Sequence, residues 1–494
     1  MLIRYVLALS FVLSGLTEIV GQTPCKEVVG YYPNWQWYDR SKLVRPATID
    51  YSKYTVINYA FFNPQLNGTI SLTDAWADEN LLLGPMNWQI NEPDVTQSLP
   101  YLCHQNGVKI LASIGGWTLS NNFPTIAASP LGRETFAQSC VALIDTYDFD
   151  GVDIDWEYPG YAPHNGTEAD ESNYILMLQE IRAELDAREL ETGETYMLTA
   201  ALPAGPSNMA NIDWPGVSAV LDFMNIMTYD FFGAFDTHCN HNSPLYAPAQ
   251  GDPQFNCAAA MQTLMNELDM DPSKLVMGVP FYGRSAKTMG APALFAPIQN
   301  NAADNATFWA DEGTPLYYNV LLNKHLFTEH WDNQAQTPYL TGNNGLDTFV
   351  SFDDTTSVSL KASFINLFNL RGAIIWEITG DYLETAPGSG IISETPLANR
   401  LNEVFCEGFV PVIPGCMNPE AMNYNVLANE EDGSCILHGC MYPSALNYNP
   451  QATIDDLSCI FEAAAGCAAD INGDGSVNVA DLLIFTSEYG SACE

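Results

Sequence analysis

Short apolar runs recur along roughly the first 400 residues, and small or polar residues follow each of them. Eight runs are expected to be strands: residues 28–32, 55–62, 109–116, 151–157, 196–203, 222–230, 275–282 and 372–378. Helical periodicity is clearest between them, at residues 134–147, 170–190, 256–268, 357–370 and 396–405. Near-continuous apolar strands that alternate with helices predict a parallel sheet closed into a (β/α)8 barrel. Residues at the C-terminal ends of these strands are therefore the candidates for chemistry.

The run at residues 151–157 carries an acid at every second position from Asp153, with large apolar residues between the acids. Successive side chains of a strand point to opposite faces, so Asp153, Asp155 and Glu157 share one face. Crowded carboxylates repel, so at least one should keep its proton to a higher pH, which suits a general acid. A solvent-facing strand and a calcium loop are the alternatives. The apolar residues and the absence of glycine at the sixth position from Asp153 disfavour a calcium loop.

The sequence DGVDIDWE at residues 150–157 resembles the D-G-x-D-x-D-x-E signature of glycoside hydrolase family 18, the chitinases. Three other expected strand ends resemble the same family, in the family's order. SIGG at 113–116 resembles S-x-G-G, MTYD at 227–230 resembles M-x-Y-D, and Trp376 stands where chitinases keep a tryptophan under the scissile sugar. The resemblance covers about residues 28–408 and implies an enzyme that hydrolyses β-1,4 bonds between N-acetylglucosamine units.

Glycosidic bond hydrolysis usually needs a carboxylic acid and a second carboxylate, which from position alone are Glu157 and a nucleophilic Asp155. The resemblance changes this assignment, because family 18 enzymes use the N-acetyl oxygen of the substrate as nucleophile and retain the anomeric configuration. Asp155 then orients the acetamido group, Asp153 tunes Asp155, and Tyr229 donates a hydrogen bond to the acetyl oxygen. The resemblance implies no cofactor for catalysis. Substrate-binding residues are expected to be Asp230, Trp376, Trp117, Tyr31, Phe62, Met227 and Tyr282.

Two other functions are known on this barrel. A chitin-binding lectin typically lacks the acid, whereas Glu157 is present. The second alternative is an endo-β-N-acetylglucosaminidase acting on N-glycans, or a peptidoglycan hydrolase. The supply of aromatic residues, the Tyr229-Asp230 pair and the insertion described next favour chitin or chito-oligosaccharides as the partner.

About seventy residues separate the strand at 275–282 from the helix at 357–370, far more than a usual connection. This segment resembles the small α+β insertion that deepens the cleft in some family 18 chitinases, and we place it at about residues 284–350, between strand seven and helix seven. A disordered loop is the alternative. Large apolar residues at 308–309, 317–318 and 349–350 favour a segment with its own core.

The amino-acid composition and the first residues of the chain indicate where the protein works. The chain has 17 basic and 59 acidic residues, a formal net charge of −42, so nucleic acid and anionic membrane surfaces are repelled. Residues 1–21 contain Arg4 and then an apolar segment, which is typical of a secretory signal peptide. No other run approaches a membrane span. We therefore expect a secreted or extracellular protein with its catalytic domain at residues 22–408.

Small modules are expected after a linker at residues 409–414. Residues 415–435 and 439–459 are two copies of one unit, together a module at about 415–460, too short for a useful core without a disulfide. They resemble small repeats of secreted or surface proteins of bacteria, for which a spacer role is expected.

The last expected module, residues 466–494, contains a calcium-loop pattern that resembles a dockerin. Dockerins carry two such loops and only one is present here, which disfavours cohesin-type docking, and a calcium-stabilised cap or a sorting element fits as well. The expected partner of the tail is a cell-surface or scaffold partner. The expected Ca²⁺ ligands are Asp470, Asn472, Asp474, Ser476, Asn478 and Asp481.

Twelve cysteines in an exported chain favour disulfides. Cys25 precedes the first strand and Cys406 ends the last helix, so both should lie where the barrel closes. The full set of expected pairs is Cys25–Cys406, Cys103–Cys140, Cys239–Cys257, Cys416–Cys435, Cys440–Cys459 and Cys467–Cys493.

Overall fold

The computed structural model describes residues 26–406, 412–461 and 468–489, in two compact units, Met1–Pro411 and Val412–Glu494. The expected signal peptide and residues 409–411 of the expected linker lie outside the described residues. Cys25, Cys467 and Cys493 also lie outside them, so the pairings that involve these cysteines stay predictions.

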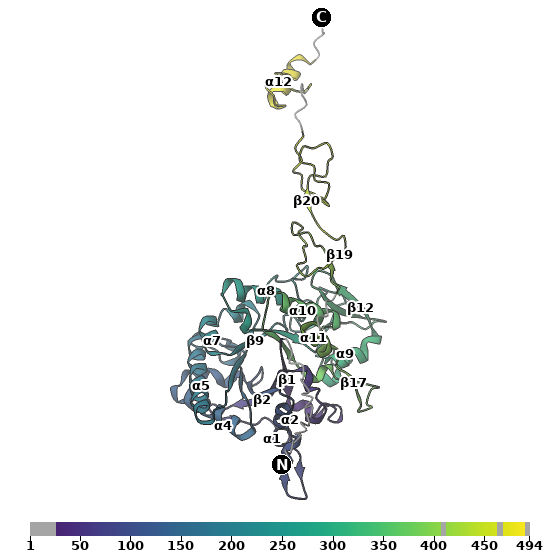
Figure 1. Ribbon diagram of the computed structural model, residues 1–494. Coiled ribbons are helices and arrows are strands. Elements are labelled where there is room, and N and C mark those ends of the chain that lie inside the picture. Colours follow the sequence, from purple (N-terminus) through teal and green to yellow (C-terminus); the bar gives the residue numbers. More distant parts are fainter. Residues whose placement is uncertain (1–25, 407–411, 462–467, 490–494) are drawn as a thin grey trace, which may run out of the picture. The chain divides into compact units, whose positions relative to one another are not determined.

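Eight parallel strands form a closed barrel in the first unit (Figure 1). They are β1 (Glu27–Pro33), β2 (Val56–Pro64), β6 (Lys109–Gly115), β7 (Gly151–Asp155), β8 (Met197–Pro203), β9 (Phe223–Met227), β10 (Leu275–Pro280) and β15 (Gly372–Trp376). Neighbouring strands pair in chain order, and β1 pairs with both β2 and β15, which closes the sheet. Each expected strand overlaps one of these strands, so the predicted (β/α)8 barrel is confirmed.

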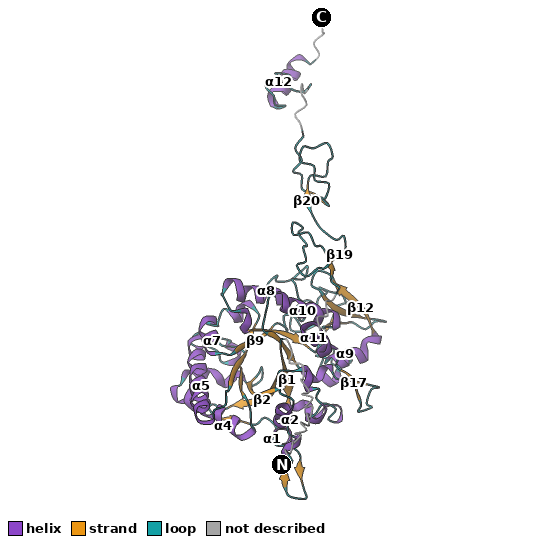
Figure 2. Cartoon of the chain, viewed as in Figure 1, coloured by secondary structure: helices purple, strands orange, loops and turns teal. Residues whose placement is uncertain are grey.

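Helices surround the barrel strands (Figure 2). The main ones are α2 (Leu99–Gln105), α4 (Pro130–Tyr147), α5 (Asp170–Thr192), α7 (Trp214–Val220), α8 (Cys257–Gln262), α10 (Thr355–Leu367) and α11 (Pro396–Cys406). Beyond the end of β7, Trp156 stacks on Phe123, with ring centroids 5.4 Å apart, and contacts Tyr174 of α5. The apolar residues around β7 thus face the helices, and Asp153 and Asp155 face the barrel interior.

An insertion lies between β10 and α10. Its strands β11 (Arg284–Lys287), β12 (Phe327–Asp332), β13 (Thr337–Gly342) and β14 (Thr348–Ser351) form an antiparallel sheet in the order β11-β14-β13-β12, and α9 (Tyr317–Asn323) precedes β12. Ala286, Ile298 and Phe349 form a buried cluster, and Tyr339 stacks on Phe349 at 5.6 Å. The predicted α+β insertion is therefore confirmed, and the alternative of a disordered loop is wrong.

Two predicted disulfides of the barrel unit, Cys103–Cys140 and Cys239–Cys257, are wrong. All four residues are buried free cysteines, and burial raises the pKa of each thiol. Cys239 packs in the cluster of the insertion. Cys257 is the first residue of α8, and its sulfur lies 3.5 Å from the carbonyl oxygen of Thr228. The four thiols lie on different segments of the unit, so the number of cysteines does not indicate which of them pair.

The second unit contains the two repeats. Cys416–Cys435 and Cys440–Cys459 are disulfides, each with a sequence separation of 19, as predicted. Each repeat has one pair of two-residue parallel strands, β18 (Pro414–Gly415) with β19 (Glu430–Glu431) and β20 (His438–Gly439) with β21 (Ile454–Asp455). Helix α12 (Val479–Glu488) follows. None of the helices in the described part of the chain has the length and apolarity needed to cross a membrane.

Candidate active site

Asp153 lies in the middle of β7 and is fully buried inside the barrel. Its Oδ2 accepts hydrogen bonds from the Tyr31 hydroxyl at 2.7 Å and the Ser113 hydroxyl at 2.8 Å. Its Oδ1 accepts from the Thr199 hydroxyl at 2.6 Å and the Asn225 amide at 3.1 Å. Burial raises the pKa of Asp153, and these four bonds oppose the rise. The donors come from β1, β6, β8 and β9, so the closed barrel itself builds this environment.

Asp155, the last residue of β7, is also buried but is bonded differently. Its Oδ1 has no hydrogen-bond partner among the described residues. Burial raises the pKa of Asp155 well above its usual range, and the charges of Glu157 and Asp153 raise it further. A buried polar atom without a partner is costly, so this oxygen is available to a donor from a bound molecule.

Glu157 lies two residues beyond the end of β7 and is partly exposed. Burial raises its pKa to about 7, and the charge of Asp230 adds to the rise. Hydrogen bonds from the Tyr158 side chain and the Trp117 backbone act in the opposite direction. A carboxyl group with this pKa still carries its proton in mildly acidic solution, so Glu157 has the properties of a general acid.

Tyr229 and Asp230 follow β9 at the same end of the barrel. The Asp230 Oδ1 accepts from the Tyr282 hydroxyl at 2.5 Å and from the Arg284 Nε at 2.6 Å. The Tyr229 ring packs edge-on against Tyr282, with centroids 6.1 Å apart. Burial raises the pKa of Tyr229 well above its usual range, and the charge of Asp155 raises it further. Tyr229 therefore keeps its proton and can donate a hydrogen bond.

An aromatic wall of Trp35, Phe61 and Trp376 lies at the ends of β1, β2 and β15. Phe61 stacks on Trp376 with centroids 5.6 Å apart and planes at 17°, and Trp35 lies 6.3 Å from Trp376. Trp35 is 47% exposed and Trp376 is partly exposed, so the wall offers apolar surface to a ligand. Tyr31 packs behind the wall, 5.5 Å from Trp376, and is buried.

Phe62, predicted to line the cleft, points outward instead. It is fully buried against Tyr59, Tyr147 and Phe149. The pairing of β2 with β6 shifts register between Tyr59 and Phe62. Such an irregularity reverses which side chains face inward, so Phe61 takes the interior position that strict alternation assigns to Phe62.

The remaining predicted binding residues lie around Glu157 and β9. Trp117 is 50% exposed, and its ring contacts those of Tyr158 and His164, at 6.4 Å and 4.5 Å. Met227 ends β9 and is buried in the barrel core, where Tyr229 packs against the same cluster. Met227 thus packs beneath Tyr229 in the barrel core and does not line the substrate-binding surface.

Several residues of the site were not among those predicted from the sequence. Thr199 and Asn225 carry a signal that could have found them, because they are polar residues at inward positions of apolar strands. Arg284, Ser120 and His164 carry no such signal, since they lie in segments without periodic pattern.

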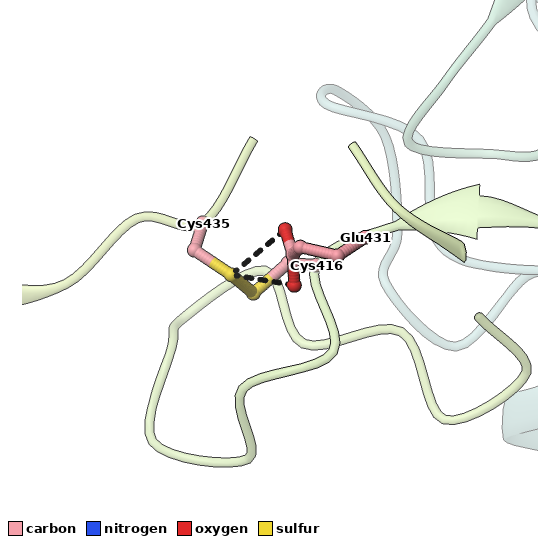
Figure 3. A group of neighbouring side chains, drawn as sticks. All are labelled: Cys416, Glu431 and Cys435. Carbon is pink, nitrogen blue, oxygen red and sulfur yellow. Dashed lines mark hydrogen bonds between the residues drawn. A yellow bond between two sulfur atoms is a disulfide. The ribbon is translucent and has the colours of Figure 1, made fainter. Parts of the chain in front are cut away.

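One group of potential metal ligands in the described residues has atoms within 4.8 Å of one another, namely Cys416, Glu431 and Cys435 (Figure 3). The two sulfurs form a disulfide, so neither can act as a thiolate ligand. The Glu431 carboxylate accepts hydrogen bonds from the backbone N–H groups of Met417 at 2.8 Å and Gly433 at 2.9 Å. The group stabilises the first repeat and is not a metal centre.

The predicted calcium ligands lie in one loop before α12. Asp470 accepts from the N–H groups of Asp474 at 3.1 Å and Gly475 at 2.8 Å. Asp481 is buried and accepts from the N–H groups of Ile471 at 2.8 Å and Asn478 at 2.8 Å. In this structure the carboxylates therefore hold the loop and cap α12, whose N-cap residue is Asn478. Asn472 bonds Asp474 at 2.9 Å, and Ser476 donates its backbone N–H to the same carboxylate.

A (β/α)8 barrel whose strands end in two carboxyl groups with raised pKa values and an aromatic wall has the arrangement of a glycoside hydrolase. Residues 27–381 match Glycosyl hydrolases family 18, and the chain belongs to this family.

Three relatives illustrate the similarity. Chitinase A1 of Niallia circulans is 35% identical over 463 residues, which cover 83% of this chain and 65% of that protein, slightly less than two thirds of its length. Chitinase 1 of Aphanocladium album is 32% identical over 75% of this chain and 87% of that protein. Catalytic domain 2 of the Ostrinia furnacalis Group II chitinase was solved with a penta-N-acetylated chito-oligosaccharide. It has a TM-score of 0.67 and 28% identity, and the match covers 78% of this chain and 97% of that one.

Proposed function

We propose that this enzyme is a chitinase that hydrolyses β-1,4 bonds between N-acetylglucosamine units. The observation that carries the proposal is the unpaired, buried Oδ1 of Asp155 beside the acid Glu157. The N–H of a 2-acetamido group supplies the missing donor, and its acetyl oxygen can accept from the Tyr229 hydroxyl. A glucose unit offers no such amide. The names of the relatives, and the chito-oligosaccharide bound to one of them, support the same class of substrate.

In the proposed reaction the substrate provides the nucleophile. Glu157 donates its proton to the glycosidic oxygen while the acetamido oxygen attacks the anomeric carbon and forms an oxazolinium ion. Asp155 orients the amide and stabilises the positive charge, and the charge of Asp153 tunes the pKa of Asp155. Glu157 then takes a proton from the water that opens the ion, so the configuration at the anomeric carbon is retained.

The stereochemistry of the first product tests this mechanism. NMR of fresh digests of a chito-oligosaccharide should show the β-anomer first, and an α-anomer would exclude retention. Efficient cleavage after a unit without its N-acetyl group would exclude substrate assistance.

The substrate is tested with a panel of chito-oligosaccharides, a high-mannose glycoprotein and peptidoglycan, assayed for released reducing ends. We expect release from the chito-oligosaccharides. Release only from the glycoprotein or from peptidoglycan would favour the alternative enzymes, and binding without release would favour a lectin.

We also propose that the protein is exported through the signal at residues 1–21 and acts outside the cell. The two repeats then serve as a spacer to the terminal module, which contacts a cell-surface or scaffold partner. N-terminal sequencing of protein from culture medium tests the cleavage site. Loss of surface attachment when residues 412–494 are removed tests the role of the tail.

Calcium is proposed only for the terminal loop, at Asp470, Asn472, Asp474, Ser476, Asn478 and Asp481. Their oxygen atoms are the ligands that Ca²⁺ prefers, and glycine stands at the sixth position of the loop. The ion would bind these oxygen atoms and stabilise the terminal module. Calorimetric titration of the full chain with Ca²⁺ should show binding that Asp470→Ala removes, with unchanged hydrolysis of a soluble oligosaccharide.

A further inference from the structure

The backbone of Glu157 is held by side chains and not by the barrel sheet. The ladder pairings of β7 end at Asp155. The Glu157 N–H donates to the Ser120 Oγ at 2.8 Å, and the Glu157 carbonyl accepts from the His164 Nδ1–H at 2.6 Å. A carbonyl can only accept, so the proton of this bond lies on Nδ1. Since these bonds fix the polar groups on both sides of the residue, they set the direction in which its carboxyl group projects.

His164 also contacts the half-exposed ring of Trp117. The two rings meet edge to face, with centroids 4.5 Å apart and planes at 63°. The Trp117 backbone N–H in turn bonds the Glu157 carboxyl group. The three residues therefore form a closed circuit: Trp117 contacts the carboxyl group of Glu157, the carbonyl of Glu157 contacts His164, and the His164 ring contacts the Trp117 ring.

We propose that His164 is a positioning residue that holds the acid Glu157 and the ring of Trp117 as one unit. The inference rests on the proposed function, because it takes Glu157 as the proton donor. The hydrogen bond from Nδ1–H fixes the position of Glu157, so its loss should lower kcat. The imidazole ring fixes the ring of Trp117, which offers its exposed face to the bound sugar. Loss of the imidazole ring should therefore raise KM.

The two contacts use different parts of the imidazole, so substitution can separate them. His164→Phe keeps a ring against Trp117 and removes the donor. His164→Asn keeps an N–H donor near the position of Nδ1 and removes the ring, and His164→Ala removes both. Each variant is made in the full chain, and kcat and KM are measured on a soluble chito-oligosaccharide, with thermal unfolding as the check of folding. The Phe and Asn variants decide the question even if the Ala variant does not fold.

We expect His164→Phe to lower kcat roughly ten- to a hundredfold with KM within about twofold, as for a slightly misplaced catalytic group. His164→Asn should keep kcat within about threefold and raise KM severalfold. The matched control is His325→Ala in the insertion. The His325 Nδ1 also bonds a backbone carbonyl, that of Leu322 at 3.1 Å, but His325 is exposed and lies outside the site. This control should change neither constant.

An unchanged kcat in His164→Phe would overturn the proposal. Equal losses in the Phe and Asn variants that follow their melting temperatures would overturn it as well, because they would indicate a structural role. If the wild type cleaves only the glycoprotein or peptidoglycan, the proposed function fails instead. The same comparison of kcat and KM on that substrate then still decides the role of His164.

Discussion

The barrel site and the tail repeats are stabilised over very different distances along the chain. Asp153 is held by Tyr31, 122 residues away in sequence, and by Asn225, 72 residues away. In the tail, the Asn423 amide donates to the Ser434 carbonyl 11 residues on at 2.7 Å, and Asn447 repeats this bond to Ser458 at the same distance. One disulfide closes each repeat. The site therefore depends on complete closure of the barrel, whereas the repeats depend on residues of the second unit and on one disulfide each, with Thr453 of the second repeat bonding the Cys435 carbonyl of the first at 3.3 Å.

Because of this difference, substitutions in the two units should have different effects on activity and stability. A change in the barrel interior reaches the site through the hydrogen bonds that join its strands, and the effect of a change in a repeat should stay within the second unit. The predictions below test this separation, from the largest expected effect to the smallest.

Glu157→Gln should lower turnover by about 10²–10⁴, because the amide keeps the size of the side chain but cannot give up a proton. Reducing ends released from a soluble chito-oligosaccharide measure the loss, and calorimetry should show that the oligosaccharide still binds. Loss of binding together with turnover would mean that Glu157 supports the fold of the site.

Lys361→Ala should destabilise the barrel unit by about 3–5 kcal/mol. The buried Lys361 ammonium donates to Asp353 and to Ser243, both at 2.7 Å, and its removal leaves a buried carboxylate without its cation. Denaturant unfolding measures the change. The control Lys324→Ala removes an exposed pair with Glu329 and should cost about 1 kcal/mol or less. Similar losses in the two variants would contradict the importance of burial.

Replacing both Cys416 and Cys435 by serine should destabilise the first repeat by about 2–4 kcal/mol, since the disulfide no longer restricts its unfolded state. Limited proteolysis should then cleave within residues 415–435, while hydrolysis of a soluble oligosaccharide stays unchanged. The same change at Cys440 and Cys459 serves as an internal comparison. A loss of hydrolysis would show that the units depend on each other.

The same contrast explains which features could be predicted from the sequence. Barrel strands and repeat disulfides follow from local periodicity and from repeated spacing, and both predictions are confirmed. The prediction that Phe62 lines the cleft is wrong, because the sequence carries no mark of the register shift in β2 that turns Phe61 inward instead. The inward polar positions of Thr199 and Asn225 are visible in the sequence, but their bonds to Asp153 depend on which strands become neighbours in the closed barrel.

The predicted pairings within the barrel failed for a related reason. An even number of cysteines says nothing about which elements bring sulfurs together, and Cys239 packs in the insertion while Cys257 begins α8. In the repeats the two cysteines of each pair belong to one short unit, so spacing alone was sufficient.

The smallest expected effect is a shift in pH dependence caused by Asp230→Asn. Glu157 must be protonated to act as the acid, and its pKa is about 7, so kcat/KM should fall as pH rises through about 7. The Asp230 carboxylate raises this pKa. A neutral amide removes the repulsion and leaves the charge of Arg284, which bonds Asp230 at 2.6 Å, without its partner. Both changes favour ionised Glu157.

The alkaline limb of the Asp230→Asn profile should therefore move to lower pH. Its position is the measured quantity, because loss of a hydrogen bond to the sugar changes only the height of the profile. Asp347→Asn is the matched control, because Asp347 pairs with Lys287 in the insertion and is not among the charges that act on Glu157. The alkaline limb of the pH profile of this variant should stay in place. A shift of the Asp230→Asn limb to higher pH would contradict the assignment of that limb to Glu157, since the loss of a neighbouring negative charge can only make a carboxylic acid stronger.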